Sequence, residues 1–227
     1  MNSTPARTAI AVFSKIPVSG RVKTRLIGPL TPAEAAGLHR ACLADACALV
    51  SSLPGCAKWL YVTGERDQVA AAALALRLAA SWRVRRQTGR TLGERLARAA
   101  REMLCAGASR VVFIGADTPW MGRCRIQRAV ELLRDADVAL GPASDGGYYL
   151  MAARGSWPQL FRGIPWGSRG VLAASRRALE RAGLRVALLP ADFDLDRPED
   201  LARVEQMARR GKLGSPQLEK WLKKRKA

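Results

Sequence analysis

The sequence has few of the side chains on which several common protein classes depend. Of 227 residues, one is histidine, His39, and the five cysteines are odd in number and form no CxxC pair. A zinc site and a disulfide framework are therefore not expected. No stretch approaches the roughly 18 uninterrupted apolar residues of a membrane-spanning helix, and no secretory leader is evident. We expect a cytoplasmic protein with reduced thiols and no membrane span.

Acidic and aromatic residues are also scarce. The chain has 38 Lys and Arg residues against 19 Asp and Glu residues, a formal net charge of +19. This excess indicates an anionic partner, although arginines scattered over solvated helix faces give the same sum. Aromatic residues make up 6% of the chain and no nucleic-acid-binding motif is present, which argues against nucleic acid as the partner.

Short apolar runs alternate with longer helical patterns along the chain. We expect strands at 8–13, 58–64, 82–87, 110–117, 137–143, 147–153 and 185–190, and helices near 32–52, 67–79, 91–106, 122–134, 169–182 and 197–211. This alternation predicts one α/β domain, residues 1–211, with a mixed, mostly parallel sheet and helices on both faces. Residues 212–227, which end in KWLKKRKA, are expected to form a basic, amphipathic C-terminal appendage.

The first predicted strand leads into the basic loop KIPVSGRVKTRL. It is not a P-loop, because Val22 precedes the lysine and the earlier glycine is also missing. In α/β sheets, ligands bind at the carboxyl ends of the strands. We therefore favour a phosphate-binding loop in which Gly20 permits close backbone approach and Lys15, Lys23 and Arg25 contact phosphate oxygens. An exposed basic connection is the alternative.

Aspartates follow several of the other strands. Asp117 lies in GADTP, and Asp194 and Asp196 lie in DFDLDRPEDL. Carboxylates without histidines suit Mg²⁺ or Mn²⁺ bridging a diphosphate, so these three are candidate metal ligands, with Asp194 preferred over Asp196. The alternative for Asp117 and Asp196 is a role as helix caps.

Two further glycine-containing segments are candidates for substrate binding. In GPASDGGYYL, Gly146 and Gly147 permit close backbone approach, and Asp145 is a candidate catalytic base; a plain Asp-Gly hairpin turn is the alternative. In QTGRTLGERL, Gln87 and Gly89 are candidates for contact with a nucleobase, or belong to a turn into a helix. Trp166, in GIPWGS, is a candidate stacking platform or a core residue.

The order of these motifs, from about Ala9 to Leu201, resembles a known family. The chain is similar to small bacterial glycosyltransferase-like proteins with the GT-A (nucleotide-diphospho-sugar transferase) fold. Some members of that family are labelled arsenosugar-biosynthesis glycosyltransferases, and the family is related to the phospholactate and molybdenum-cofactor guanylyltransferases. The segments that carry the resemblance are FSKIPVSGRVKTRL, QTGRTLGERL, GADTP, GPASDGGYYL, FRGIPWGS and DFDLDRPEDL.

The resemblance implies a role for each matching segment. Lys15, Lys23 and Arg25 would hold donor phosphates, while Gln87 and Gly89 would lie near the base. The cation would be bound by Asp117 with Asp194 or Asp196. Asp145, Gly146, Gly147 and Tyr148 would shape the sugar or acceptor side. The chain departs from the family pattern at Thr91, where an aspartate is expected, and at Arg197, where a threonine is more usual.

Three functions follow as hypotheses. The first is metal-dependent glycosyl transfer from a nucleotide-diphosphate sugar to a small acceptor, in which Lys23 and Mg²⁺ or Mn²⁺ stabilise the departing diphosphate and Asp145 is the base. The second is nucleotidyl transfer from a nucleoside triphosphate to a phosphorylated acceptor. The third is a non-catalytic, basic nucleic-acid-binding protein.

Overall fold

A seven-stranded β-sheet forms the centre of the protein, whose computed structural model describes residues 7–155 and 157–226. The strand order is β3-β2-β1-β4-β6-β5-β7, and β6 runs antiparallel to both of its neighbours while the other pairs are parallel. The predicted mixed, mostly parallel sheet is confirmed. The strands are β1 (Thr8–Ser14), β2 (Cys56–Val62), β3 (Trp82–Arg86), β4 (Arg110–Ile114), β5 (Val138–Pro142), β6 (Tyr148–Arg154) and β7 (Val186–Leu188).

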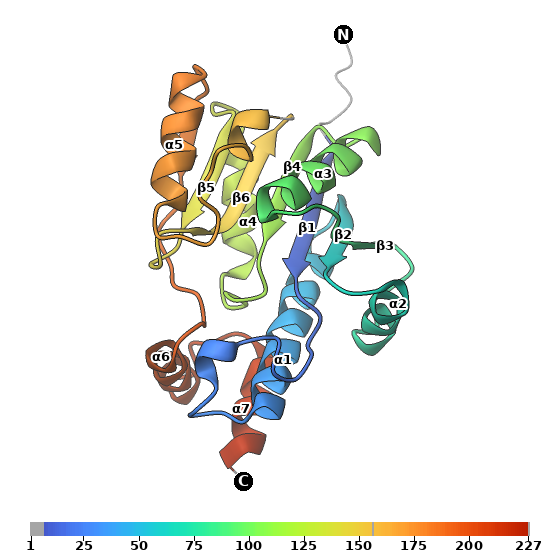
Figure 1. Cartoon of the computed structure of the whole chain (residues 1–227), viewed down its shortest axis with the longest axis vertical. Helices are drawn as coiled ribbons and strands as arrows, with labels where there is room; N and C mark the ends of the chain where they lie inside the picture. The colour runs from blue at the N-terminus through green and yellow to red at the C-terminus, as the bar shows by residue number, and fades with distance from the viewer. Residues whose placement is uncertain (1–6, 156, 227) are drawn as a thin grey trace.

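Helices connect most of the strands and follow the last one (Figure 1). The first begins after Thr31, whose side chain accepts a hydrogen bond from the Glu34 amide while Glu34 reaches back to the Thr31 amide, a reciprocal cap that fixes the start of the helix. The helices are α1 (Pro32–Ser51), α2 (Arg66–Ala75), α3 (Leu92–Cys105), α4 (Gly122–Leu132), α5 (Val171–Arg181), α6 (Pro198–Arg209) and α7 (Pro216–Lys226), with short 3₁₀ turns η1 (Thr24–Leu26) and η2 (Pro158–Leu160).

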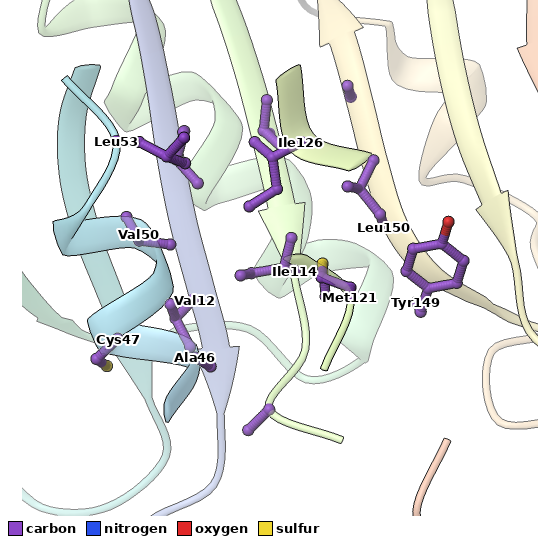
Figure 2. Close-up of a cluster of buried hydrophobic side chains, with 14 of the residues drawn as sticks. Val12, Ala46, Cys47, Val50, Leu53, Ile114, Met121, Ile126, Tyr149 and Leu150 are labelled. Atoms are coloured by element: carbon purple, nitrogen blue, oxygen red, sulfur yellow. The ribbon is translucent and has the colours of Figure 1, made fainter. Parts of the chain in front are cut away.

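Apolar side chains cover both faces of the sheet, as a central parallel strand such as β1 requires. On one face, Val12 of β1 and Ile114 of β4, which are in register, pack with Val50 of α1 and Ile126 of α4 (Figure 2). On the other face, residues of α3 and α5 pack against the sheet. At the sheet edge, β3 has the sequence WRVRR, and its arginines make this exposed strand a poor template for pairing with another chain.

The C-terminal segment that was predicted to be an appendage is packed against the rest of the protein. Leu213, Leu218 and Leu222 are buried in a third apolar cluster with residues of α1 and α6. Buried Asp45 of α1 accepts hydrogen bonds from the amides of Gln217 (3.0 Å) and Leu218 (2.8 Å), which lie in the first turn of α7. Figure 1 shows α6 and α7 at the end of the sheet toward which β1 points. The basic residues of α7 therefore lie on a helix that belongs to the folded unit.

The loops at the carboxyl ends of the parallel strands lie together on this edge of the sheet. The segment after β7 runs past the ends of β5 and β4: Asp192 pairs with Ala143 in an isolated bridge, and the Leu195 amide donates to the Asp117 carbonyl at 2.9 Å. Within the described residues, no helix is both long and apolar enough to cross a membrane.

Candidate active site

A buried ion pair joins the loop after β1 to the loop after β4. Lys23 Nζ lies 2.6 Å from Asp117 Oδ1 and also donates to the Leu195 carbonyl oxygen. The Lys23 side chain is 3% exposed, whereas the Asp117 side chain is 46% exposed although its Oδ1 atom is buried. Burial by itself lowers the pKa of Lys23, but the neighbouring Asp117 carboxylate outweighs it and the pKa lies above its ordinary value. Lys23 is therefore charged, and a third N–H remains for another ligand.

His39 supports this pair from α1. Its Nε2 atom lies 3.1 Å from both Ser14 Oγ and the Lys15 carbonyl oxygen, and its Nδ1 atom lies 3.9 Å from Asp117 Oδ1. Burial lowers the pKa of His39 despite the nearby carboxylate, so the ring is neutral at pH 7. The imidazole thus binds the start of the basic loop through Nε2, while its Nδ1 atom lies near Asp117 without a hydrogen-bond partner among the described residues.

Asp194 lies beside the same pair. The Thr118 hydroxyl donates to Asp194 Oδ1 at 2.7 Å. Burial, together with the negative charge of Asp117, raises the pKa of Asp194 to about 7. Carboxylates that repel each other in this way form a site that a cation stabilises.

The protein offers only part of the ligand set that a divalent cation needs, and the phosphates of a nucleotide would supply the rest. Within residues 7–155 and 157–226, no three His, Cys, Asp or Glu side chains are arranged to hold a metal ion by themselves. Mg²⁺ in nucleotide sites is usually bound by one or two carboxylates together with substrate phosphates. Asp117 and Asp194 fit that pattern.

The other late aspartates have cationic partners. Arg25 Nη1 lies 2.6 Å from Asp196 Oδ2, and both side chains are exposed. Asp192 lies 2.6 Å from Arg125 of α4 and accepts a hydrogen bond from the Phe193 amide at 2.9 Å. The alternating aspartates therefore bind three different partners; the charge of Asp117 acts on Asp194, whereas Asp196 lines the same cleft as Asp117.

The turn between β5 and β6 and Arg25 of the basic loop line the same cleft. Asp145 is exposed, and its Oδ1 atom accepts from the Gly147 amide at 2.8 Å. Gly146 has φ +91°, and a Cβ atom there would collide with the Arg169 carbonyl oxygen. The Gly146 carbonyl also accepts from the Leu172 amide at 3.0 Å. Glycine at position 146 therefore lets the turn rest directly on the start of α5.

Two clefts adjoin along this edge and share Arg25, Leu92 and Asp196. The donor-side cleft, of about 540 Å³, is lined by the basic loop, Gln87, Arg95, Asp117 and His39. The acceptor-side cleft, of about 590 Å³, is lined by Asp145, Gly147, Tyr148, Trp166, Asp194 and their neighbours. Both names are labels of position along this edge: the donor-side cleft lies toward the loop after β1, and the acceptor-side cleft lies toward the turn between β5 and β6.

Comparison with known proteins identifies the family. Residues 45–168 match the family described as "uncharacterized protein conserved in bacteria (DUF2064)", which is more than half of the chain. This chain is a DUF2064 protein. No curated protein matches the sequence.

Solved structures establish the fold of this DUF2064 protein. A structure from Desulfovibrio desulfuricans G20, described as a candidate nucleotide-diphospho-sugar transferase, is 30% identical, covers 96% of this chain and 95% of its own, and has a TM-score of 0.88. A cytidylyltransferase from Leptospira borgpetersenii is 12% identical, with 97% and 95% coverage and a TM-score of 0.58. CMP-2-keto-3-deoxy-manno-octonic acid synthetase in complex with CTP is 14% identical, with 91% and 100% coverage and a TM-score of 0.52. The predicted family resemblance and GT-A fold are confirmed.

The structure brings most of the predicted site residues of the DUF2064 protein to the two clefts. Lys15, Lys23 and Arg25 line the donor-side cleft, whereas Gly20 forms an exposed turn with φ +72° and open space around it. The Gln87 amide nitrogen donates to the carbonyls of Ser14 (2.7 Å) and Tyr61 (3.0 Å). Gln87 thus ties the ends of the strands together and presents only its carbonyl oxygen to a ligand.

Thr91 and Gly89 both shape the start of α3, which agrees with the alternative role of their segment as a turn into a helix. Thr91, the departure from the family pattern, caps α3 by accepting from the Glu94 amide at 3.2 Å. Gly89 has φ +138° and packs closely against the backbone of Arg95, so it shapes the entry to α3. His39 is a site residue that was not predicted from the sequence. The one signal for it is that it is the only histidine, because the pattern of α1 does not show which loop its side chain contacts.

Proposed function

We propose that this DUF2064 protein transfers a glycosyl group from a nucleotide-diphosphate sugar to a small acceptor. The observation that carries the proposal is the opposite charge of the two adjoining clefts. The donor-side cleft contains five Lys and Arg side chains against two carboxylates, and the acceptor-side cleft contains three arginines against five carboxylates. In a chain with a net charge of +19, an acidic cleft beside a basic one is a specific arrangement.

The basic cleft suits the donor diphosphate. Lys15 and Arg25 approach from the loop after β1, and Arg95 approaches from α3. Charge-assisted bonds from such side chains to phosphate oxygens are stronger than neutral hydrogen bonds. Lys23 is already neutralised by Asp117, so it supports the site through its position and its remaining N–H.

The acidic cleft suits sugar and acceptor hydroxyls. Asp145 is exposed there, and carboxylates accept hydrogen bonds from hydroxyl groups. The Tyr148 and Trp166 rings pack edge to face, with 5.9 Å between their centroids, and add an apolar wall. A phosphate group at the reacting end of the acceptor would meet excess negative charge in this cleft, which favours glycosyl over nucleotidyl transfer.

A divalent cation fits the proposal at Asp117 and Asp194. Mg²⁺ or Mn²⁺ bound there supplies Lewis-acid neutralisation of the departing diphosphate. The residues of the chain bind and orient: Asp145 accepts the proton of the attacking hydroxyl, and Arg25 pairs with Asp196 at the border of the two clefts. Asp196 remains a predicted metal ligand, but its ion pair with Arg25 would have to break before it could bind a cation.

Nucleotidyl transfer is the second candidate, because the cationic donor-side cleft suits a triphosphate as well, and one structural neighbour was solved with CTP. The products separate the two reactions. A nucleotidyltransferase releases pyrophosphate, whereas a glycosyltransferase releases a nucleoside diphosphate.

The first experiment is a thermal-shift panel of UDP-, GDP-, ADP- and dTDP-sugars and the matching triphosphates, with and without Mn²⁺. We expect one nucleotide sugar to stabilise the wild type in a metal-dependent manner. Asp117→Asn should abolish this shift, while Asp135→Asn, at an exposed aspartate after α4, should preserve it. Stabilisation by a triphosphate alone, followed by pyrophosphate release, would replace the proposal with nucleotidyl transfer.

A further inference from the structure

A third cavity lies beyond the acceptor-side cleft and has no part in the function proposed above. It has a volume of about 910 Å³, larger than either cleft, and runs between the first half of α3 and the loop from Phe161 to Gly167. We call it the α3 groove. Its polar lining is mainly basic: Arg98 and Arg101 come from α3, and Arg162 comes from the facing loop.

These three arginines are exposed and form no ion pair with any residue in the described ranges. Two carboxylates of α3 lie four residues from Arg98: Glu94 before it and Glu102 after it. Glu102 binds Arg85 at 2.8 Å and the Tyr61 hydroxyl at 2.9 Å. The positive charge in the groove is therefore left for a ligand.

Glu94 is the one acidic residue among the described residues that line the groove, and its carboxylate is already hydrogen-bonded. Its side chain accepts from the Arg90 amide at 2.9 Å at the start of α3. Arg98 and Arg101 lie three residues apart on one helix face, and Arg162 lies on the opposite wall of the groove. An anion between them can therefore accept hydrogen bonds from guanidinium groups on both walls.

The groove is continuous with the acceptor-side cleft. Leu92, Trp166 and Gly167 line both cavities. Trp166 is held in place because its Nε1 atom donates to the Phe161 carbonyl at 3.2 Å. Gly93 of α3 packs so closely beneath it that a Cβ atom would collide with Trp166 Nε1 and the Phe161 carbonyl oxygen. The wall between the two cavities is thus a fixed aromatic edge past which one ligand can extend.

We propose that the α3 groove binds an anionic group of the acceptor, a phosphate or a carboxylate that lies away from the reacting hydroxyl. This inference rests on the glycosyl transfer proposed above. It deepens that proposal, since it names the acceptor class: a hydroxyl compound whose uncharged end enters the acidic cleft while its anionic end passes Trp166 and meets Arg98, Arg101 and Arg162.

The test uses ¹⁹F NMR of the full chain labelled with 5-fluorotryptophan, in which Trp166→Phe assigns the Trp166 signal. The probes are inorganic phosphate, glycerol 3-phosphate and glycerol. We expect the first two probes to shift the Trp166 signal and glycerol to leave it unchanged. The triple variant Arg98→Ala/Arg101→Ala/Arg162→Ala should weaken phosphate binding by roughly tenfold or more, because charge-assisted bonds from both walls are lost.

A matched control removes the same charge elsewhere. Arg123, Arg134 and Arg177 are exposed and lie outside the groove, so their triple alanine variant should retain phosphate affinity. Alanine is favourable in helices, where Arg98, Arg101, Arg123 and Arg177 lie. Arg134 and Arg162 are exposed residues outside the helices. Both variants should therefore keep the thermal stability of the wild type. An unmoved Trp166 signal in the wild type, or equal affinity in the groove variant and the wild type, would overturn the inference.

The nucleotide-sugar thermal shift, measured on the same proteins, separates this inference from the proposed function. If no nucleotide sugar binds the wild type but phosphate still shifts Trp166, glycosyl transfer fails and the groove is an anion site unconnected with an acceptor. If the donor binds and the groove variant keeps that shift while losing phosphate, both proposals stand. If the donor binds and phosphate does not, the acceptor class is wrong and the transfer reaction stands.

Discussion

Replacing Lys23 by methionine tests the ion pair at the centre of the site. The change retains an unbranched apolar stem and removes the ammonium group, so the buried Oδ1 atom of Asp117 faces no cation. Breaking a fully buried pair costs about 3–5 kcal/mol. Because the Asp117 side chain is 46% exposed, water offsets part of this loss, and we expect the free energy of unfolding to fall by about 2–3 kcal/mol. The corresponding fall in Tm is roughly 4–12 °C.

The pH dependence of this loss has a defined sign. In the wild type, burial alone would raise the pKa of Asp117, but Lys23 and His39 hold it below its ordinary value. The wild-type carboxylate therefore adds stability above the unfolded pKa of about 4, and this contribution is lost as pH falls through the folded pKa. In the variant, Lys23 no longer opposes the effect of burial, so the pKa of Asp117 rises and its ionised form destabilises the fold. The difference between the two proteins should be largest near pH 7 and should shrink as Asp117 becomes protonated.

A double-mutant cycle with Asp117→Asn isolates the pair. Urea unfolding with EDTA present, at pH 7 and pH 4, gives the four free energies that the cycle needs. We expect a coupling energy of about 2 kcal/mol at pH 7 and a smaller value at pH 4. A coupling below about 0.5 kcal/mol at pH 7 would refute the argument, since Lys23 and Asp117 would then not depend on each other for stability.

Three further predictions test other parts of the site and the fold. Burial and Asp117 raise the pKa of Asp194 to about 7, so the free energy of unfolding should fall as the pH rises from 4 to 7 in EDTA. Asp194→Asn should make this pH dependence less steep. The same pH dependence in both proteins, measured by urea unfolding, would contradict the prediction. Gly146→Ala should lower the free energy of unfolding by at least about 2 kcal/mol more than Gly163→Ala, because both glycines have positive φ but only Gly146 lacks space for a Cβ atom; equal Tm values would count against the close contact. Asp45→Ala should cost about 1–2 kcal/mol and increase hydrogen exchange in α7, whose first amides it caps; unaltered exchange there would show that packing alone holds the helix.

The sequence predicted the fold well because its signals are local. Apolar runs such as TAIAVF alternate with helical patterns, and each predicted strand is present within a few residues of its expected range. The convergence of the basic loop with Asp117 and Asp194 was also predictable, since the carboxyl ends of parallel strands share one edge of a sheet. The C-terminal segment was recognised as amphipathic, but its packing on α1 depends on Asp45, a residue far away in the chain.

The pairings within the site were not predictable from the sequence. Lys23 reads as a free phosphate ligand, whereas it is bound to Asp117, 94 positions later. In the same way, three alternating aspartates give no sign that Asp192 belongs to Arg125. The pairing of acids with bases depends on how side chains at the ends of separate strands are placed in space. Neither residue spacing nor composition gives that placement.

These pairings give the net charge of +19 a more specific meaning than composition does. Where arginines bind carboxylates, as Arg85 binds Glu102, the excess charge has no ligand to attract. The donor-side cleft and the α3 groove instead keep unneutralised cations, and the acidic cleft between them is bordered on both sides by positive charge. A molecule that is anionic at both ends and carries hydroxyls in its middle matches this order of charges, as a donor diphosphate, a sugar and an anionic acceptor do when they lie end to end.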